Sequence, residues 1–386
     1  MKIGILTQPL QYNYGGLLQN YALQQALIRL GHEPETIDHG KEKQYRFRHL
    51  VSINKARVLH IFFPSKYDLP KYELRKQELS VIQQHTQFFI DKYINHTPIV
   101  NTKEGFRSVA SEKNYNAYVV GSDQCWRPNY NGSFQDEMFL SFVSEQKGIK
   151  RVAYAASFGT DLWEMTDTQT ARCAGLAKLF DIISVREASA VDLCNKYLGV
   201  NAIQVLDPTM LLKKEDYIKI ITDENEPKSR GSLFHYILDP SKEKSSFIDQ
   251  IAQRRNYIPF TVMPKYQASN RTRSDVKHRI KDCAFPSVTS WLRGFIDAEM
   301  VIVDSFHGAV FSIIFNKPFW VIKNGKRGNA RFESLLSLFQ LENRLIDVND
   351  MIERDWDGLI NWDFVNKVLE KERNRSFDIL NKGLTY

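Results

Sequence analysis

The sequence predicts an α/β protein made of two Rossmann-like domains that face a cleft. Three observations lead to this prediction. Short apolar runs rich in β-branched residues alternate with segments whose apolar residues recur at helical spacing. Most of the apolar runs end in small or polar residues, as expected of parallel strands whose carboxyl ends open toward one edge. The length of 386 residues suits two domains of roughly 150–200 residues each better than one core.

Residues 1–38 predict a βαβ unit. A buried strand is expected at 2–7, a helix with one apolar face at 17–30, and a second strand at 36–38. Between the first strand and the helix, Gly15 and Gly16 would let the backbone approach a ligand, because they carry no side chain. A plain tight turn explains the two glycines equally well, and the loop matches neither the dinucleotide-binding nor the P-loop fingerprint.

Residues 41–115 interrupt this alternation and are expected to form a helical insertion in the first domain, with a long amphipathic helix over about 71–93. Basic and aromatic residues are interleaved over 41–63. That mixture would suit a membrane surface or a lipid-linked substrate. A solvated basic face over a packed apolar one is the more common arrangement and stays as the alternative.

Four more strands complete the first domain, which is expected to span residues 1–206. They are predicted at 117–120, 151–156, 181–185 and 204–206, and polar clusters follow them at 121–124, 157–159, 186–187 and 207–209. Parallel strands would gather these clusters at one edge of a sheet. Each cluster also has a structural explanation. Asp123 can cap a helix, residues 157–159 can form a packing turn, and Arg186 can pair with Glu187.

The second domain is expected to span residues 207–386. Strands are predicted at 232–238, 258–262, 300–303 and 319–322, and helices at 247–254, 288–298, 331–339 and about 361–380. The stretch 300–322 is the most informative. A β-branched apolar run breaks at Asp304, continues as a helix, and gives way to a second apolar run after Pro318.

Residues 304–308 occupy the loop after a predicted strand, where ligands bind in open α/β sheets. The helix start that follows supplies free backbone N–H groups and a positive dipole end, which suit an anion. His307 can titrate near neutral pH and exchange protons with a ligand. The alternative is that Asp304 and Ser305 cap the helix and that His307 is a surface residue.

The composition is that of an ordinary soluble globular protein, with 43% hydrophobic and 25% charged residues. No stretch approaches the roughly 18 apolar residues of a membrane span, and only a single lysine and a very short apolar run open the chain. A cytoplasmic location is therefore expected, at the inner face of the membrane if the insertion contacts lipid. The four widely spaced cysteines predict free thiols and no metal site, and a nucleophilic Cys125 is the weaker alternative because no base adjoins it. The net charge of +7 does not discriminate among nucleic acid, an anionic membrane and acidic small substrates.

Together, the motifs resemble those of the polysaccharide pyruvyl transferase family over nearly the whole chain. The matching segments are 13–16 with Gln19, 121–124 with Trp126, 157–159, 184–187, 207–209, 304–308, and Asn329 with Arg331. The resemblance implies a fold like that of the GT-B glycosyltransferases. It also implies transfer of a pyruvyl group from phosphoenolpyruvate to two sugar hydroxyls, giving a cyclic ketal in a surface or capsular polysaccharide.

The resemblance further implies that Arg186 and His307 lie at the donor site. We expect His307 to transfer protons, Asp304 or another carboxylate to orient it, and Asp123 to bind or deprotonate the acceptor hydroxyls. Arginine suits a donor with a carboxylate and a phosphate, because its planar fork binds two oxygens at once. The expected donor-binding residues are Arg186, Ser305, Phe306, Gly308, Lys323, Arg327 and Arg331. The expected acceptor-binding residues are Asn13, Gly15, Gly16, Gln19, Ser122, Gln124, Trp126, Ser157, Phe158 and Gly159.

Several choices stay open at this point. Some family members carry an arginine just before the histidine, where this chain has Ser305 and Phe306, so the cation that holds the phosphate is not fixed. No tightly bound cofactor or metal is expected, and the sugar acceptor is either free or lipid-linked. Two other functions compete: a nucleotide-sugar glycosyltransferase, which the same fold permits, and a non-catalytic anion-binding or nucleic-acid-binding protein. No recognised nucleic-acid motif is present, so no nucleic-acid partner is expected.

Overall fold

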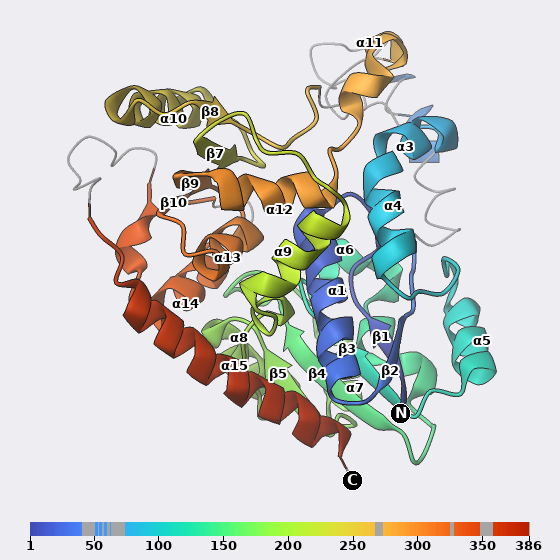
Figure 1. The fold of residues 1–386 in the computed structure, drawn as a ribbon. Helices are drawn as coiled ribbons and strands as arrows, with labels where there is room; N and C mark the ends of the chain where they lie inside the picture. The colour runs from blue at the N-terminus through green and yellow to red at the C-terminus, as the bar shows by residue number, and fades with distance from the viewer. Residues whose placement is uncertain are drawn as a thin grey trace.

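The computed structural model describes residues 1–40, 74–266, 273–324, 328–347 and 358–385, together with scattered positions between 51 and 62. Within these residues the chain forms two parallel sheets, each flanked by helices (Figure 1). The predicted α/β fold class is therefore confirmed.

The first sheet has the strand order β2-β1-β3-β4-β5-β6, and all of its pairings are parallel. Its four central strands, β1, β3, β4 and β5, are short, mostly apolar and buried, as the sequence pattern predicts for a sheet covered on both faces, whereas the edge strands β2 and β6 are partly exposed. The strands are β1 (Lys2–Leu6), β2 (Glu33–Thr36), β3 (Ala117–Val120), β4 (Lys150–Ala156), β5 (Ile182–Val185) and β6 (Ile203–Gln204). The helices of this half are α1 (Tyr14–Arg29), α5 (Lys103–Lys113), α6 (Pro128–Asn131), α7 (Asp167–Ala177) and α8 (Ala188–Leu193).

Helix α1 begins at Tyr14, three residues before the predicted start at residue 17. Gly15 and Gly16 therefore lie in its first turn, and the prediction that they form a loop is wrong. Glycine lowers helix propensity by about 1 kcal/mol relative to alanine, which is why the sequence pattern alone places the helix start too late. Glycine is needed at position 15 because this residue lies against the ring of His307, with no space for a side chain.

The described part of the insertion is helical, as predicted. Helices α3 (Lys76–Ile82) and α4 (Gln84–Tyr93) replace the single helix expected over 71–93, with a break at Gln83. Ile82 packs with Val276 and Cys283, so α3 contacts the second half of the chain. Most of the basic and aromatic stretch at 41–63, including the positions expected to contact a membrane, lies outside the described residues.

The second sheet has the order β11-β10-β9-β7-β8, again with parallel pairings. The predicted strands at 300–303 and 319–322 match to the residue. The strands are β7 (Leu233–Tyr236), β8 (Pro259–Phe260), β9 (Met300–Val303), β10 (Phe319–Ile322) and β11 (Leu345–Ile346). The helices are α9 (Lys214–Asp223), α10 (Lys242–Arg255), α11 (Arg273–Arg279), α12 (Val288–Asp297), α13 (Phe306–Ile314), α14 (Ala330–Leu338) and α15 (Trp362–Leu384).

Both sheets are doubly wound in the same way. In each, the second strand lies on one side of the first and the third strand on the other side. The strand order therefore reverses between β1 and β3 in the first sheet and between β7 and β9 in the second. Ligands in such sheets bind beyond the carboxyl ends of the strands at this switch point.

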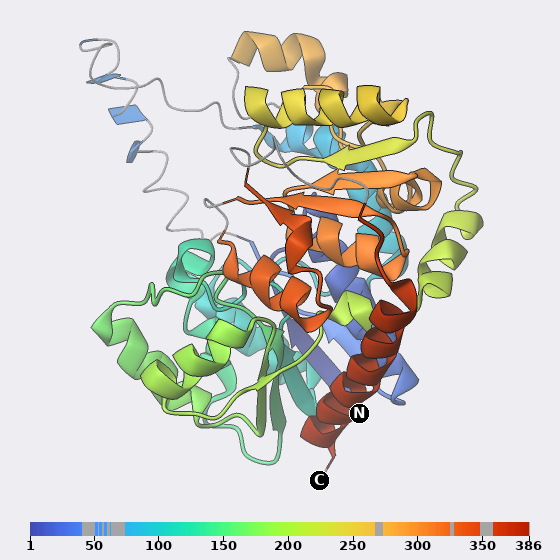
Figure 2. The ribbon, with the colours of Figure 1, turned by 90° about the vertical axis from the view of Figure 1, so that its left-hand side faces the viewer.

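The two halves share a core and a brace. One cluster of buried residues joins α1, through Tyr14 and Leu18, to Trp291 of α12 and to β9 and α13. The terminal helix α15 packs Leu369 against this shared core and Leu380 against the first sheet, and it runs along both halves (Figure 2). The domain boundary at 206/207 stays a prediction, but the end of α15 is part of the first half's packing.

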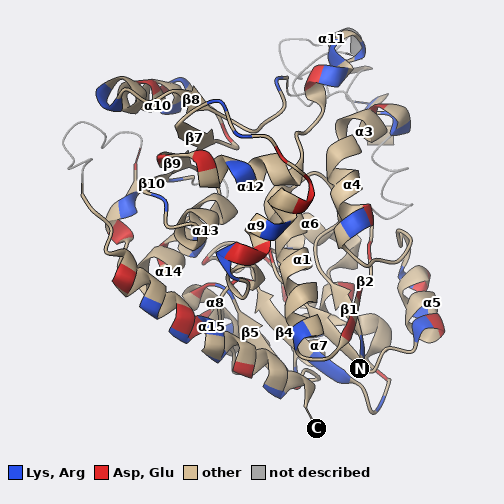
Figure 3. Cartoon of the chain, viewed as in Figure 1, with Lys and Arg blue, Asp and Glu red and all other residues tan. Residues whose placement is uncertain are grey.

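Two surface properties bear on partners. Among the described residues, no helix is both long enough and apolar enough to span a bilayer. Basic and acidic residues alternate along α15 and lie side by side on α5 (Figure 3). The charge on these helices is therefore mixed in sign and does not form the basic stripe that is typical of nucleic-acid-binding proteins.

Candidate active site

Four charged side chains and one histidine, from both halves, gather where the two sheets face each other. Three follow strands of the first sheet: Asp123 after β3, Arg186 after β5 and Asp207 after β6. The other two belong to the first turns of helices in the second half, His307 in α13 and Arg331 in α14. We call these residues the charged cluster. All five are buried, with at most 8% of each residue exposed.

Arg186 is the centre of the ion pairs. Its Nη1 lies 3.0 Å from Oδ2 of Asp207, and its Nη2 lies 3.2 Å from Oδ1 of Asp123. Burial opposes the charged form of Arg186, but the neighbouring Asp123 and Asp207 outweigh burial and raise its pKa. The alternative explanation, an ion pair of Arg186 with Glu187 at a helix start, is not what the structure shows, because Glu187 accepts hydrogen bonds from Ser157 and from the N–H groups of Phe158 and Gly159.

The two carboxylates of the cluster stay ionised in spite of their burial. Burial acts to raise the pKa of Asp123, but Arg186, His307 and Arg331 together hold it below its usual value. Burial likewise acts on Asp207, whose pKa is nonetheless held far below its usual range by His307 and Arg186. Asp123 adopts φ 64°, a left-handed conformation that aspartate tolerates better than most side chains.

His307 lies between two helix N-termini. It is the second residue of α13, and Gly15, the second residue of α1, approaches it so closely that an added Cβ would lie 2.1 Å from its Nδ1. Its Nε2 lies 3.5 Å from Oδ2 of Asp207, and this buried nitrogen has no hydrogen-bond partner. Helix N-termini favour anions, so two of them beside an imidazole form a suitable environment for a negatively charged ligand.

Phe306 packs against both arginines of the cluster. Its ring centre is 4.3 Å from the guanidinium carbon of Arg186 and 5.7 Å from that of Arg331. Burial, followed by the nearby charge of Arg186, lowers the pKa of Arg331 to about 10. The two arginines stay protonated near neutral pH, and a small pocket lined by Arg186, Asp207, Phe306 and Arg331 lies beside them.

Of the two options for orienting His307, Asp304 or another carboxylate, the structure excludes Asp304. The carboxylate of Asp304 accepts hydrogen bonds from the N–H of Leu238, 2.6 Å away, and from Nζ of Lys244, also 2.6 Å away. The adjacent positions in the sequence suggested a pair, but Asp304 ends the strand and faces β7, whereas His307 lies in the helix and faces the first half. Asp207 is the carboxylate beside His307.

The other predicted donor residues divide into three groups. Ser305 caps α13 by accepting a hydrogen bond from the N–H of Gly308 at 3.0 Å, so the capping interpretation of Ser305 is confirmed. Gly308 packs against Val303, with no space for a side chain. Lys323 is exposed, and Arg327 lies outside the described residues.

Four of the ten predicted acceptor residues belong to the packing around the site. Trp126 and Phe158 are buried and pack against each other, in the core of the first half. Ser157 and Gly159 hold Glu187, as a packing turn would. These four residues therefore pack around the site. Their contact with an acceptor stays a prediction.

The remaining acceptor candidates lie nearer the switch point of the first sheet. Gln19 accepts a hydrogen bond from the N–H of Ser122 at 2.9 Å and so fixes the loop that carries Asp123. Gln124 is held by Arg127 at 3.0 Å. Asn13 is exposed at the start of α1, and Gly16 lies beside it. Of these, Asn13 is the one whose side chain is open to solvent.

Sequence reasoning missed the role of Asp207. Its Oδ1 accepts hydrogen bonds from the backbone N–H and the hydroxyl of Thr209, at 3.0 and 2.7 Å, which leaves Oδ2 to the charged cluster. A signal was present in the sequence, because residues 207–209 form a polar cluster at the end of a predicted strand.

Cys125 is a structural thiol, as the sequence favoured. It is fully buried, and burial raises the pKa of its thiol to about 12. A thiol with so high a pKa is almost entirely protonated near neutral pH and is a poor nucleophile.

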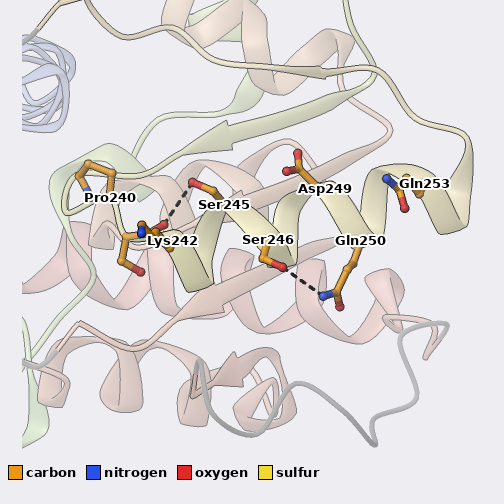
Figure 4. A pocket seen from close by; sticks show the side chains of 8 residues that line it. Pro240, Lys242, Ser245, Ser246, Asp249, Gln250 and Gln253 are labelled. Carbon is orange, nitrogen blue, oxygen red and sulfur yellow. Dashed lines mark hydrogen bonds between the residues drawn. The ribbon is translucent and has the colours of Figure 1, made fainter.

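A larger hollow lies elsewhere. It has a volume of about 660 Å³ and is lined by one face of α10 and the residue before it, including Ser241, Ser245, Asp249 and Gln253 (Figure 4). None of the residues of the charged cluster lines it. Polar side chains from a single exposed helix surround it, so we assign it no role in the chemistry.

Alanine at position 15 is expected to displace His307, because the new Cβ would overlap its ring. A displacement of about 1 Å can lower turnover by about a hundredfold, so we expect Gly15→Ala to lower turnover about 10- to 100-fold. Gly175→Ala in α7 is the matched control, because a Cβ there meets nothing within 4 Å. Equal turnover of the two variants would contradict the close approach of α1 to His307.

Asp38 stabilises the loop before α1 and gives a pH-dependent test. It accepts a hydrogen bond from the N–H of Leu10 at 3.1 Å, and burial raises its pKa to about 6. The native state thus binds a proton more tightly than the unfolded state does, so the free energy of unfolding should decline as pH rises from about 4 to about 6. Asp38→Asn should remove this decline and raise stability at pH 7 by about 1–2 kcal/mol, measured by urea unfolding. A decline that persists unchanged in the variant would assign it to other groups.

Comparisons with known proteins bear on this site. The family model described as polysaccharide pyruvyl transferase matches residues 13–326, a range that includes Asp123, Arg186, Asp207 and His307 but not Arg331. No curated protein matches the chain significantly.

Solved structures with similar folds were also found. The UDP-GlcNAc 2-epimerase of Methanocaldococcus jannaschii is 10% identical, with 96% of this chain and 99% of that chain covered and a TM-score of 0.46. The UDP-GlcNAc 2-epimerase of Neisseria meningitidis is 11% identical, with 96% and 100% covered and a TM-score of 0.45. MurG of Acinetobacter baumannii is 8% identical, with 99% and 94% covered and a TM-score of 0.39. Because these scores are low, the description of the fold rests on the strand order.

Proposed function

Because the chain belongs to the polysaccharide pyruvyl transferase family, we propose that it transfers a pyruvyl group from phosphoenolpyruvate to two hydroxyls of a sugar. The product would be a cyclic ketal on a surface or capsular polysaccharide or on its precursor. The observation that carries this proposal is the position of His307 between two helix N-termini and near two buried arginines.

The donor has the charges that such a site would bind. Phosphoenolpyruvate carries a phosphate and a carboxylate on a three-carbon skeleton. Arg186 and Arg331, which both pack against the ring of Phe306, can each bind one anionic group through a planar fork. The N-termini of α1 and α13 add free N–H groups and positive dipole ends. This arrangement supports a small dianionic or trianionic ligand.

The reaction needs proton transfers in both directions. A proton adds to the methylene carbon of the donor, and one sugar hydroxyl bonds to the neighbouring carbon and loses its proton. The second hydroxyl then bonds to the same carbon and loses its proton, while the carbon–oxygen bond to phosphate breaks and phosphate leaves with a proton. Two protons are thus released by the hydroxyls, and two are taken up by the methyl group and by phosphate.

His307 is the residue suited to these transfers, because an imidazole can give and accept protons near neutral pH. Asp123 has a pKa below its usual value, so it is a weak base. We therefore assign Asp123 to binding an acceptor hydroxyl rather than to deprotonating it.

The contacts of Asp304 argue against a nucleotide-sugar donor in the second half. In doubly wound sheets, a nucleotide would sit beyond β7 and β9, at the switch point. Here the Asp304 carboxylate joins the two loops at this point, through the N–H groups of Leu238 and Asp239 and through Lys244. These contacts cross the space that a nucleotide would occupy, which favours phosphoenolpyruvate as the smaller donor.

Calorimetric titration tests the proposal. Phosphoenolpyruvate and a panel of nucleotide sugars are titrated separately into the full chain, and phosphate release is then measured with candidate sugar acceptors. We expect binding of phosphoenolpyruvate and no binding of the nucleotide sugars. Binding of a nucleotide sugar alone would instead assign the protein to the glycosyltransferases, and steeply salt-dependent binding of nucleic acid would support the non-catalytic alternative.

A further inference from the structure

A single oxygen atom of Asp207 is shared by donors from both halves of the chain. Thr209 fixes Oδ1 through two hydrogen bonds. Oδ2 then faces Nη1 of Arg186 at 3.0 Å, the hydroxyl of Ser122 at 3.3 Å and Nε2 of His307 at 3.5 Å. Because Thr209 holds the carboxylate, its direction is set by the turn after β6 and not by either of its partners across the site.

Arg186 and His307 are competing partners of this oxygen. At 3.0 Å the arginine makes a hydrogen bond, whereas at 3.5 Å the imidazole nitrogen does not, and it has no other partner. The Nε of Arg186 is also buried without a hydrogen-bond partner. The Nε of Arg186 is therefore available to a ligand, and an anion that binds Arg186 would weaken its hold on Asp207.

We propose that Asp207 is a positioning residue that couples donor binding in one half to protonation of His307 in the other. This inference rests on the proposed function. When the anionic donor binds Arg186, Oδ2 of Asp207 becomes the acceptor for Nε2–H of His307. His307 then takes up a proton from solvent and is held as an imidazolium, whose other ring nitrogen can protonate the donor.

The charges around His307 support this coupling. The groups that face it are Asp207 after β6, Asp123 after β3, Arg186 after β5 and Arg331 in α14, while α1 contributes Gly15 and no charge. In the free protein the negative charges of the two carboxylates are balanced by the positive charges of the two arginines. A bound donor adds negative charge to this balanced set, and an added proton on His307 offsets part of it.

The test is the number of protons taken up when phosphoenolpyruvate binds. It is measured by calorimetry of the full chain in two buffers with different heats of ionisation, over about pH 6–8, the range in which histidine and the donor phosphate titrate. The variants are Asp207→Asn, which keeps the shape of the side chain and removes its charge, and Glu137→Gln. Glu137 is a buried carboxylate paired with Lys103, outside the charged cluster, so it is the matched control.

We expect the wild type and Glu137→Gln to take up the same fraction of a proton, and Asp207→Asn to take up less than about half of it. Donor affinity of Asp207→Asn should change by less than about tenfold, and turnover should fall by about a hundredfold, as for loss of a general acid–base contribution. A purely structural Asp207 would lower affinity and thermal stability and leave proton uptake per bound donor unchanged, and that result would overturn the inference. If phosphoenolpyruvate does not bind the wild type, the proposed function fails, and the inference that rests on it fails too.

Discussion

Replacing His307 with asparagine is expected to lower turnover by about 10²- to 10⁴-fold, the usual contribution of general acid–base catalysis. Asparagine fills much of the space beside Gly15 and can still hydrogen-bond, but it cannot transfer protons near neutral pH. Phosphoenolpyruvate affinity should change by less than about tenfold, because the arginines and the helix N-termini are left in place.

Phosphate release measures the turnover of this variant, and calorimetry measures donor binding. His278→Asn is the matched control, since that imidazole is exposed on α11. If His307→Asn turned over at the wild-type rate, proton transfer would have to be assigned to another group. A loss of donor binding as large as the loss of turnover would instead make His307 a binding residue.

Replacing Arg186 with alanine should have two effects. Donor affinity should fall about tenfold to a thousandfold, because a charge-assisted double contact contributes a few kcal/mol. The free energy of unfolding should also fall, by about 3–5 kcal/mol, since Asp123 and Asp207 would lose their buried counter-ion. Arg186→Lys should recover part of the stability and less of the affinity, because lysine keeps the charge but not the planar fork.

A loss of stability alone could lower the apparent affinity for the donor, because less of the protein would be folded. The control is therefore another buried arginine. Arg151 lies near the amino end of β4, whereas Arg186 follows the carboxyl end of β5. Arg151 donates hydrogen bonds to the carbonyls of Val143 and Gln146. Arg151→Ala should destabilise the protein and leave donor affinity per folded molecule unchanged. Unchanged affinity in Arg186→Ala would remove Arg186 from the donor site.

The strands could be predicted from sequence because their signal is local. Residues 300–303 and 319–322 are short β-branched or aromatic runs bounded by polar residues or proline, and burial on both faces makes such runs continuous. The start of α1 could not be placed, because glycine is a weak helix former and its presence in the first turn is explained by contact with His307, far away in the sequence. Local propensity carries no information on such a contact.

The same distinction applies to the site. Sequence patterns were enough to predict the proximity of Asp123, Arg186 and His307. Parallel strands bring polar loops to one edge of a sheet, and two such edges face each other. The partner of His307 was not, since Asp304 is closer in sequence whereas Asp207 is closer in space. Which way a carboxylate turns at the end of a strand depends on neighbours such as Lys244 and Thr209, and these are fixed only when the sheets pack.

The path of α15 determines how the halves can move. The chain passes from the first half to the second near residues 206–212, and α15 carries it back. These two crossings are joined by hydrogen bonds, from the N–H of Leu206 to Ser376 and from Arg373 to the carbonyl of Met210. These two crossings, together with the buried core that α1 shares with α12 and α13, hold the halves to each other, and Asp207 lies beside the crossings. Any displacement of one half relative to the other should therefore be smallest near the shared oxygen of Asp207 and its partners.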